Sequence, residues 1–331
     1  AAMKTREHRI EASASSARSP VFLNARGSLV TRKREQGLAI VLALFVVALA
    51  STAATYMVWQ QQLLIRQSEN LNALAQGQAV ARAALDWGRL IIAEDGGQQN
   101  KVDHFGEDWA RSLEPTPVEG GQFVGKIADA QARYNLNSLV DRDTDGVVLR
   151  RLLAVLELPG DLANGVRDWI DADDQVSFPG GAEDLDYLGG NDPYRTANRL
   201  LIDINALYRI KGFTPEIVKR LRPFVTALPR GTPINVNTAS PEVLTALFED
   251  LTLDAAKDLA AKREKTPFDD LNAFKDRTKT LKLLNPNMID VKCDFFLLTA
   301  NVLFNRTELS YTAMVQRQPT GGPKLLWQRQ Q

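Results

Sequence analysis

Residues 37–59, GLAIVLALFVVALASTAATYMVW, determine how the chain begins its fold. From Leu38 to Trp59 no side chain carries a charge. As a helix rising about 1.5 Å per residue, this run reaches about 30 Å, the thickness of the apolar core of a bilayer. The basic triplet RKR at residues 32–34 precedes it. Because positive charge stays on the cytoplasmic side, the sequence predicts a single membrane span with the following domain outside.

Three interpretations of this apolar run remain open. A plain signal anchor would simply keep it. Ala48-Leu49-Ala50 has the A-x-A pattern of a secretory signal peptidase site, and cleavage there would remove most of the run. The third interpretation depends on Gly37, which separates the basic leader from the apolar residues. This arrangement resembles the type IV prepilin signal, in which a peptidase cuts between residues equivalent to Gly37 and Leu38 and the helix is retained.

The residues after the run favour retention. From Gln60 to about Glu94, apolar side chains recur every three or four positions and no proline intervenes, which predicts one helix running on from the membrane. Pilin-like proteins resemble this plan. Most of them carry Glu at the fifth mature position, where this chain has Leu42. In those proteins the Glu contacts the N-terminal amine of the neighbouring subunit in the filament. A chain without this Glu resembles the subunit type at the end of the filament, which has no neighbour beyond it.

The rest of the sequence, after the N-terminal helix, predicts an α+β domain interrupted by a helical insert. Residues 122–130 alternate as a strand, and residues 295–302, 308–316 and 324–328 are three more strands. Because such short strands are not stable alone, we expect them to pair in one small antiparallel sheet. Residues 137–290 between them are predicted to be helical.

The insert contains a weak internal repeat. Thr214 and Ser240 are each followed by proline, which is typical of a helix N-cap and its first position. Residues 234–247, INVNTASPEVLTAL, are typical of a SAM-like or helix-hairpin-helix-like unit. Such units often bind DNA, but the hairpin at residues 249–252, EDLT, is acidic and has no glycine, so a phosphate nest is not expected. A membrane-tethered DNA-binding protein remains the alternative function.

Composition restricts the chemistry. The chain has 40 basic and 40 acidic side chains and no net charge, which argues against nucleic acid as its main partner. Cys293 is the only cysteine, so no intramolecular disulfide or multi-thiolate zinc site can form. With only His8 and His104, a catalytic triad is not expected. We therefore expect a structural protein, not an enzyme.

Acidic residues crowd one loop-like stretch. They are Asp168, Asp171, Asp173, Asp174, Glu183, Asp184 and Asp186. Like charges this close need a cation or full solvation. Oxygen ligands without His or Cys favour Ca²⁺ over zinc. A solvated loop and a catalytic carboxylate pair, as in a periplasmic hydrolase, are the alternatives. A second acidic segment, residues 141–146, matches half of an EF-hand loop, but its twelfth position is Leu152.

Several ordered blocks together resemble one family. They are RYNLNSL (133–139), DWIDADD (168–174), GAEDLDYL (181–188), PYRTANRLLIDINALYRIKG (193–212), RPFVTALP (222–229) and INVNTASPEVL (234–244). From about Arg32 onward the chain resembles the K-type minor pseudopilins of type II secretion systems (the GspK/XcpX family).

The resemblance implies a set of ranges and ligands. The ranges are a leader at 1–37, the transmembrane part of the helix at 38–59, a first pseudopilin part at 60–136, an α insert with two helical subdomains at 137–290, and C-terminal strands at 291–331. It also implies calcium bound by the insert. Our candidate ligands are Asp171, Asp173, Glu183, Asp184 and Asp186, with Asn191 and Asp192 as further donors.

The resemblance further implies where the protein is located and which partners it has in the secretion system. The mature protein would have a methylated N-terminus and cross the bacterial inner membrane once, with its C-terminal domain in the periplasm. It would form a heterotrimeric tip complex with the I- and J-type minor pseudopilins, prime pseudopilus assembly and support protein export across the outer membrane. The H-type minor pseudopilin, the major pseudopilin, prepilin peptidase and secreted substrates are the other expected partners, and nucleic acid is not.

Overall fold

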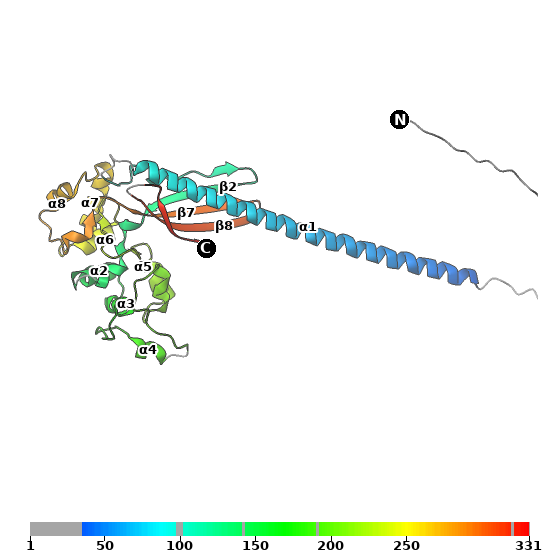
Figure 1. Ribbon diagram of the computed structural model, residues 1–331, viewed down its shortest axis with the longest axis horizontal. Coiled ribbons are helices and arrows are strands. Elements are labelled where there is room, and N and C mark those ends of the chain that lie inside the picture. Colours follow the sequence, from blue (N-terminus) through cyan, green and yellow to red (C-terminus); the bar gives the residue numbers. More distant parts are fainter. Residues whose placement is uncertain (1–34, 97–101, 141–142, 190–191, 319–320, 331) are drawn as a thin grey trace, which may run out of the picture. The chain divides into compact units, whose positions relative to one another are not determined.

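The computed structural model describes residues 35–96, 102–140, 143–189, 192–318 and 321–330 (Figure 1). The chain divides into two units, residues 1–66 and 67–331, which are described separately. Most of the predicted leader, together with the candidate ligand Asn191, lies outside the described residues.

The first unit contributes the beginning of helix α1 (Glu35–Asp95). Every described side chain from Gly37 to Arg66 is exposed, including the apolar ones. A core helix of a water-soluble domain would bury such residues. The helix is long and apolar enough to cross a membrane, and it fits a single-pass anchor.

The second unit contains a five-stranded antiparallel sheet in the order β1-β2-β7-β8-β9. The strands are β1 (Thr116–Val118), β2 (Gly121–Asp129), β7 (Phe295–Phe304), β8 (Thr307–Gln316) and β9 (Lys324–Gln330). The predicted strands are therefore confirmed, including the pairing of β2 with β7, a strand from the far end of the chain. Within this sheet the short strand β1 was missed, because it has too few residues to show alternation.

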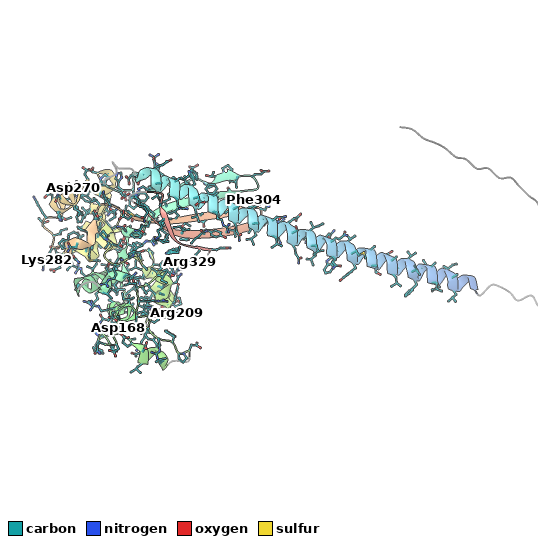
Figure 2. All side chains as sticks on the ribbon, viewed as in Figure 1. Asp168, Arg209, Asp270, Lys282, Phe304 and Arg329 are labelled. Atoms are coloured by element: carbon teal, nitrogen blue, oxygen red, sulfur yellow. The ribbon has the colours of Figure 1, made fainter. Side chains whose placement is uncertain are left out.

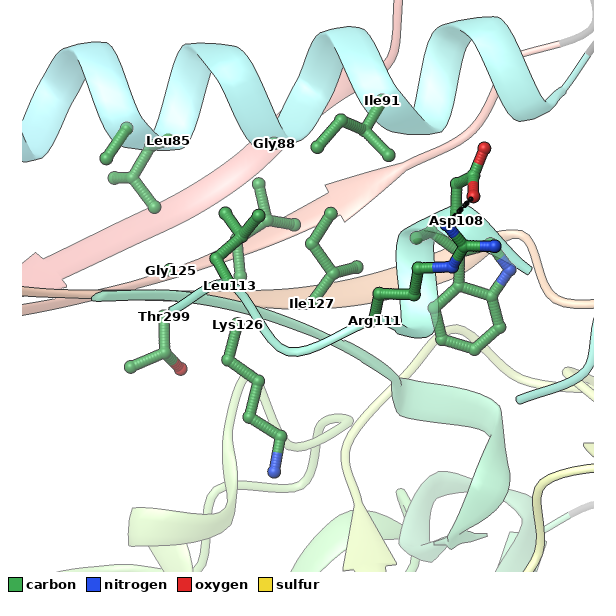
Figure 3. A pocket seen from close by; sticks show the side chains of 13 residues that line it. Leu85, Gly88, Ile91, Asp108, Arg111, Leu113, Gly125, Lys126, Ile127 and Thr299 are labelled. Atoms are coloured by element: carbon green, nitrogen blue, oxygen red, sulfur yellow. Dashed lines mark ion pairs between the residues drawn. The ribbon is translucent and has the colours of Figure 1, made fainter. Parts of the chain in front are cut away.

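Residues 67–95 of α1 cover one face of this sheet (Figure 1). Ala81, Leu85 and Ile92 of the helix join a core with Phe296, Leu298 and other residues of β7 and β8. A cavity of about 20 Å³ remains between α1 and β2, bordered by Gly88, Leu113 and Ile127 (Figure 3). It is large enough for one water molecule and too small for a ligand.

The helices of the insert lie between β2 and β7 in the sequence. They are α2 (Asp143–Val155), α3 (Leu162–Ile170), α4 (Asp184–Leu188), α5 (Pro215–Leu221), α6 (Pro241–Leu247), α7 (Leu253–Lys265) and α8 (Leu271–Arg277). The 3-10 helices are η1 (Asp108–Ala110), η2 (Ala130–Ala132), η3 (Leu136–Val140), η4 (Ile204–Arg209) and η5 (Pro286–Met288). One apolar core runs through residues 134–291. The predicted N-caps are confirmed, because the side chains of Thr214 and Ser240 accept hydrogen bonds from the amides of Ile217 and Val243.

Two parallel strand pairs reveal a clearer repeat than the one predicted. They are β3 (Tyr134–Asn135) with β4 (Val225–Thr226), and β5 (Ile234–Asn235) with β6 (Ile289–Asp290). The first strand of each pair ends in an asparagine, and a second asparagine follows two residues later. The side chain of Asn135 accepts a bond from the amide of Asn137, and the side chain of Asn235 accepts one from the amide of Asn237. The counterpart of Ile234–Asn237 is thus Tyr134–Asn137, a polar signature that apolar periodicity does not display.

Candidate metal centre

Helix α3 and the loop after it bring the predicted acidic residues to one place. Buried Trp169 and Ile170 anchor the end of α3, and Asp171 follows as its C-cap. Trp169 lies edge-on to Tyr187 of α4, with ring centroids 5.3 Å apart. This aromatic contact fixes α4 against α3, and it positions Glu183 at the start of α4 opposite the end of α3.

Three carboxylates converge. Asp171, Asp173 and Glu183 each present an oxygen, and these oxygens lie within 4.8 Å of one another. Asp173 is exposed, Asp171 is half-buried and Glu183 is only 6% exposed. The group therefore opens to solvent on the Asp173 side and is closed on the Glu183 side, which suits an ion with part of its water shell retained.

Asp168 lies in the insert (Figure 2), close enough for its charge to act on Asp171 and Glu183. It is fully buried in α3, and its Oδ2 accepts a bond of 3.0 Å from the amide of Ser177. Its Oδ1 accepts none from the described residues, and neither do the buried Oδ1 of Asp171 and Oε1 of Glu183. Buried carboxylate oxygens without a donor are costly, so these three atoms fit a bound cation.

The crowding changes the proton affinity of the group. Burial, then the charges of Asp173 and Asp168, raises the pKa of Asp171 to about 6. Burial, then the charges of Asp168 and Asp171, raises the pKa of Glu183 to about 7. Both shifts have the direction expected when negative charges are gathered without a counter-ion. The donor set, four carboxylates without His or Cys, matches a hard cation.

A glycine makes the loop possible. A Cβ atom on Gly181 would lie 2.2 Å from Asp168 Oδ2 and 2.3 Å from the carbonyl oxygen of Ser177. The backbone of Gly181 therefore approaches both Asp168 and the loop more closely than any other residue allows. This glycine lets the loop pack closely against Asp168.

The other predicted ligands lie elsewhere or bind other partners. Asp184 accepts bonds from the amide and hydroxyl of Thr196, at 3.0 and 2.8 Å, and pairs with Arg195. Asp186 pairs with Lys211 at 2.7 Å and accepts a bond from the amide of Glu183. The hydrogen bonds from the Thr196 hydroxyl and from Lys211 lower the pKa of Asp184 and Asp186, respectively.

Asp192 is exposed and is not part of the converging carboxylates. The second predicted segment, residues 141–146, begins outside the described residues, and Leu152 at its twelfth position is buried in the apolar core. The predicted hairpin of the helix-hairpin-helix unit joins α6 to α7, where Glu249 pairs with Lys282 at 2.7 Å.

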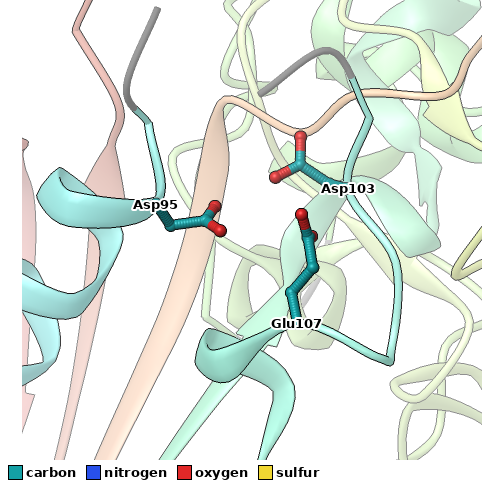
Figure 4. A group of neighbouring side chains, drawn as sticks. All are labelled: Asp95, Asp103 and Glu107. Atoms are coloured by element: carbon teal, nitrogen blue, oxygen red, sulfur yellow. The ribbon is translucent and has the colours of Figure 1, made fainter. Parts of the chain in front are cut away.

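A second acidic group has a different character. Asp95, Asp103 and Glu107 point toward one another near the end of α1 (Figure 4). Arg317 already pairs with Asp95 and with Asp103, and Glu107 accepts bonds from the amide of His104 and the indole of Trp109. The protein thus supplies its own cation and donors here, and the group is a structural clamp rather than a metal site.

Comparisons with known proteins agree with this architecture. Two family models, both described as type II secretion system (T2SS) protein K, match residues 132–230 and 234–291. The boundary between them lies just before the second asparagine signature. The type II secretion system protein K of Pseudomonas aeruginosa is 37% identical over 232 residues, which are 66% of this chain and 69% of that protein.

Two further comparisons extend over more of the chain. The protein K of Aeromonas hydrophila is 30% identical over 289 residues, 80% of this chain and 87% of that protein. Among solved structures, a chain of the GspK-GspI-GspJ complex from enterotoxigenic Escherichia coli superposes with a TM-score of 0.70 at 24% identity, covering 80% of this chain and 99% of that chain. The α+β fold with a helical insert is therefore shared with that structure, and the chain belongs to the type II secretion system protein K family, the K-type minor pseudopilins.

Proposed function

We propose that this chain is the tip subunit of a type II secretion pseudopilus, where it primes assembly and supports protein export. The observation that carries the proposal is the shared fold with a chain from a complex of three such proteins, GspK, GspI and GspJ. By this likeness, the I- and J-type minor pseudopilins are the expected direct partners of this chain.

The N-terminal helix supports an end position. Its exposed apolar side chains need lipid or the helices of other subunits. At Leu42 it lacks the acidic side chain through which most pilin-like subunits contact the amine of the next one. We propose that prepilin peptidase cleaves between Gly37 and Leu38, that the new N-terminus is methylated, and that the domain beyond the membrane is periplasmic.

The converging carboxylates support a structural calcium ion. We propose that Asp171, Asp173 and Glu183 hold it, with Asp168 behind them. When bound, Ca²⁺ would neutralise the mutual repulsion of these groups. The residues themselves join the end of α3 to the start of α4, so the ion would stiffen this part of the insert. Asp184 and Asp186 support the same turn from outside through Thr196 and Lys211.

Co-purification tests the proposed function. The full chain, extracted in detergent, should elute as one complex with its I- and J-type minor pseudopilins when all three are co-expressed. The major pseudopilin, co-expressed alone with the chain, is the matched control and should not give an equally stable complex. Elution of the chain by itself would contradict the proposal. Retardation of duplex DNA by the chain would favour the membrane-tethered DNA-binding alternative.

A further inference from the structure

A groove with a cavity volume of about 590 Å³ lies between the sheet and the insert. One wall comes from the sheet face opposite α1, with Leu297, Thr312, Met314 and Trp327. The other wall comes from residues 202–205 and 222–227 of the insert. Ile202 is 64% exposed there although it is aliphatic. The size and the mixed apolar and polar lining are those of a binding groove.

Arginine side chains give the groove a positive end. Arg133, Arg222 and Arg329 line it, and Asp203 is the only carboxylate among its lining residues. Asp203 is already engaged, because its Oδ2 pairs with Arg329 and its Oδ1 accepts a bond from the amide of Asn205. This ion pair connects the two walls. Arg222 acts on Asp203 only through its charge, and neither Arg133 nor Arg222 forms an ion pair with a carboxylate that lines the groove.

Within the described part of the chain, neither of those two groups donates a hydrogen bond to an anionic acceptor. Arg222 donates only to a neutral oxygen, Oδ1 of Asn205 at 2.8 Å. Arg133 is half-buried and forms no hydrogen bond or ion pair with the residues that the structure describes. The nearby carboxylate of Asp129 is occupied by Gln131, Asn235 and Thr238. Burial lowers the pKa of Arg133, Asp129 opposes this, and Arg222 adds to it, so an incoming anion would relieve a repulsion.

The same face of the sheet is hollowed at a second place. A second hollow of about 500 Å³ is lined by Gln122, Asn301, Leu303 and Glu308. Because alternate residues of a strand share a face, Leu297 and Thr299 of the groove and Asn301 and Leu303 of the hollow form one line along β7. This line is about 20 Å long, the length of an extended peptide of six or seven residues. Its charge changes from arginine at one end to Glu308 at the other.

We propose that this surface binds an extended segment of a partner protein with carboxylate side chains at the end near the insert, apolar side chains in the middle and a basic side chain at the far end. Arg133 and Arg222 bind the carboxylates. Leu297, Met314 and Trp327 contact the apolar side chains. The inference does not depend on the place of the chain in a pseudopilus, because the surface belongs to the isolated chain.

Peptide binding to the full chain in detergent tests the inference. The probe is the fluorescein-labelled heptapeptide Asp-Asp-Leu-Val-Leu-Thr-Lys, followed by fluorescence anisotropy. We expect saturable binding that Arg133→Gln and Arg222→Gln each weaken about tenfold, the effect of losing a charged hydrogen bond. Arg306→Gln removes an exposed arginine from the hairpin between β7 and β8 and should leave binding unchanged. The same peptide with Asn-Asn in place of Asp-Asp should bind at least tenfold more weakly.

A second readout does not depend on variants. A photoreactive group on the central valine of the probe should label β7 or β8, identified by peptide mapping. The inference is overturned if the wild-type chain does not bind the probe, if Arg306→Gln weakens binding as much as Arg133→Gln does, or if the label appears outside the residues that line the groove and the hollow. Equal binding of a heptanucleotide and the peptide would also overturn it, because it would show attraction for any anion.

Discussion

Arg317 Nη1 lies 2.8 Å from Asp103 Oδ1, although 214 residues separate the two in the sequence. The same guanidinium pairs with Asp95 at the end of α1, donates to the carbonyl oxygen of Cys293, and stands over the ring of Phe296, 4.7 Å from its centroid. One side chain thus connects the end of the N-terminal helix, the segment before η1 and the sheet.

We expect Arg317→Ala to lower the free energy of unfolding of the full chain by about 3–5 kcal/mol, because it leaves Asp103 buried without a counter-charge. Urea denaturation in detergent, followed by tryptophan fluorescence, measures this. Arg306→Ala, at an exposed position, should change the value by less than about 0.5 kcal/mol. Similar losses in the two variants would show that the clamp is not stabilising.

Glu183→Gln is expected to abolish the stabilisation of the full chain by calcium, because it removes the most buried charge of the three converging carboxylates. The measurement is the unfolding midpoint in EDTA and after addition of excess calcium. Asp174→Asn is the matched control, since Asp174 is exposed, lies next to Asp173 and is not in the group. A calcium-induced rise that survives in Glu183→Gln but not in Asp174→Asn would disprove our ligand assignment.

The effect of calcium should depend on pH. In the folded apo chain the pKa of Asp171 is raised to about 6 and that of Glu183 to about 7, whereas in the unfolded chain both ionise near pH 4. The folded state therefore holds more protons between these values, and the contribution of these groups to stability is lost as the pH rises through about 4 to 7.

In our proposal calcium would bind the ionised carboxylates, so it would have to displace those protons in acid. We expect the rise in unfolding midpoint caused by calcium to be larger at pH 8 than at pH 5.5. In EDTA we expect the unfolding midpoint to be lower at pH 8 than at pH 5.5. Thermal scans at both pH values provide the comparison. Calcium stabilisation that is the same at both would mean that the ion does not bind these two groups.

Local patterns predicted much of the fold. The uncharged run after Gly37, the alternation in β7 and β8, and the caps Thr214 and Ser240 are each encoded by neighbouring residues. Gly88 shows where such reasoning ends. Helix propensity alone marks a glycine within a helix as unfavourable. A Cβ at Gly88 would lie 2.7 Å from Leu298 Cδ2, so the role of this glycine is close packing of α1 on the sheet.

The candidate metal centre was predictable as a region rather than as a set of ligands. Composition pointed to the acidic stretch, because crowded carboxylates need compensation wherever they fold. It did not indicate that Thr196 and Lys211 would bind Asp184 and Asp186, or that Asp168 would be buried with one oxygen unpartnered. These outcomes depend on residues that approach only after the insert has folded.

The central claim is that the apolar segment after Gly37 remains as the first helix of the finished subunit. N-terminal sequencing of the chain recovered from bacterial membranes that contain prepilin peptidase tests it most directly, with Gly37→Ala as the matched variant. We predict that the wild-type protein begins at a methylated Leu38 and that Gly37→Ala keeps its leader. A wild-type protein that begins at Ser51 would contradict the account, because the helix would then have been removed as a signal peptide.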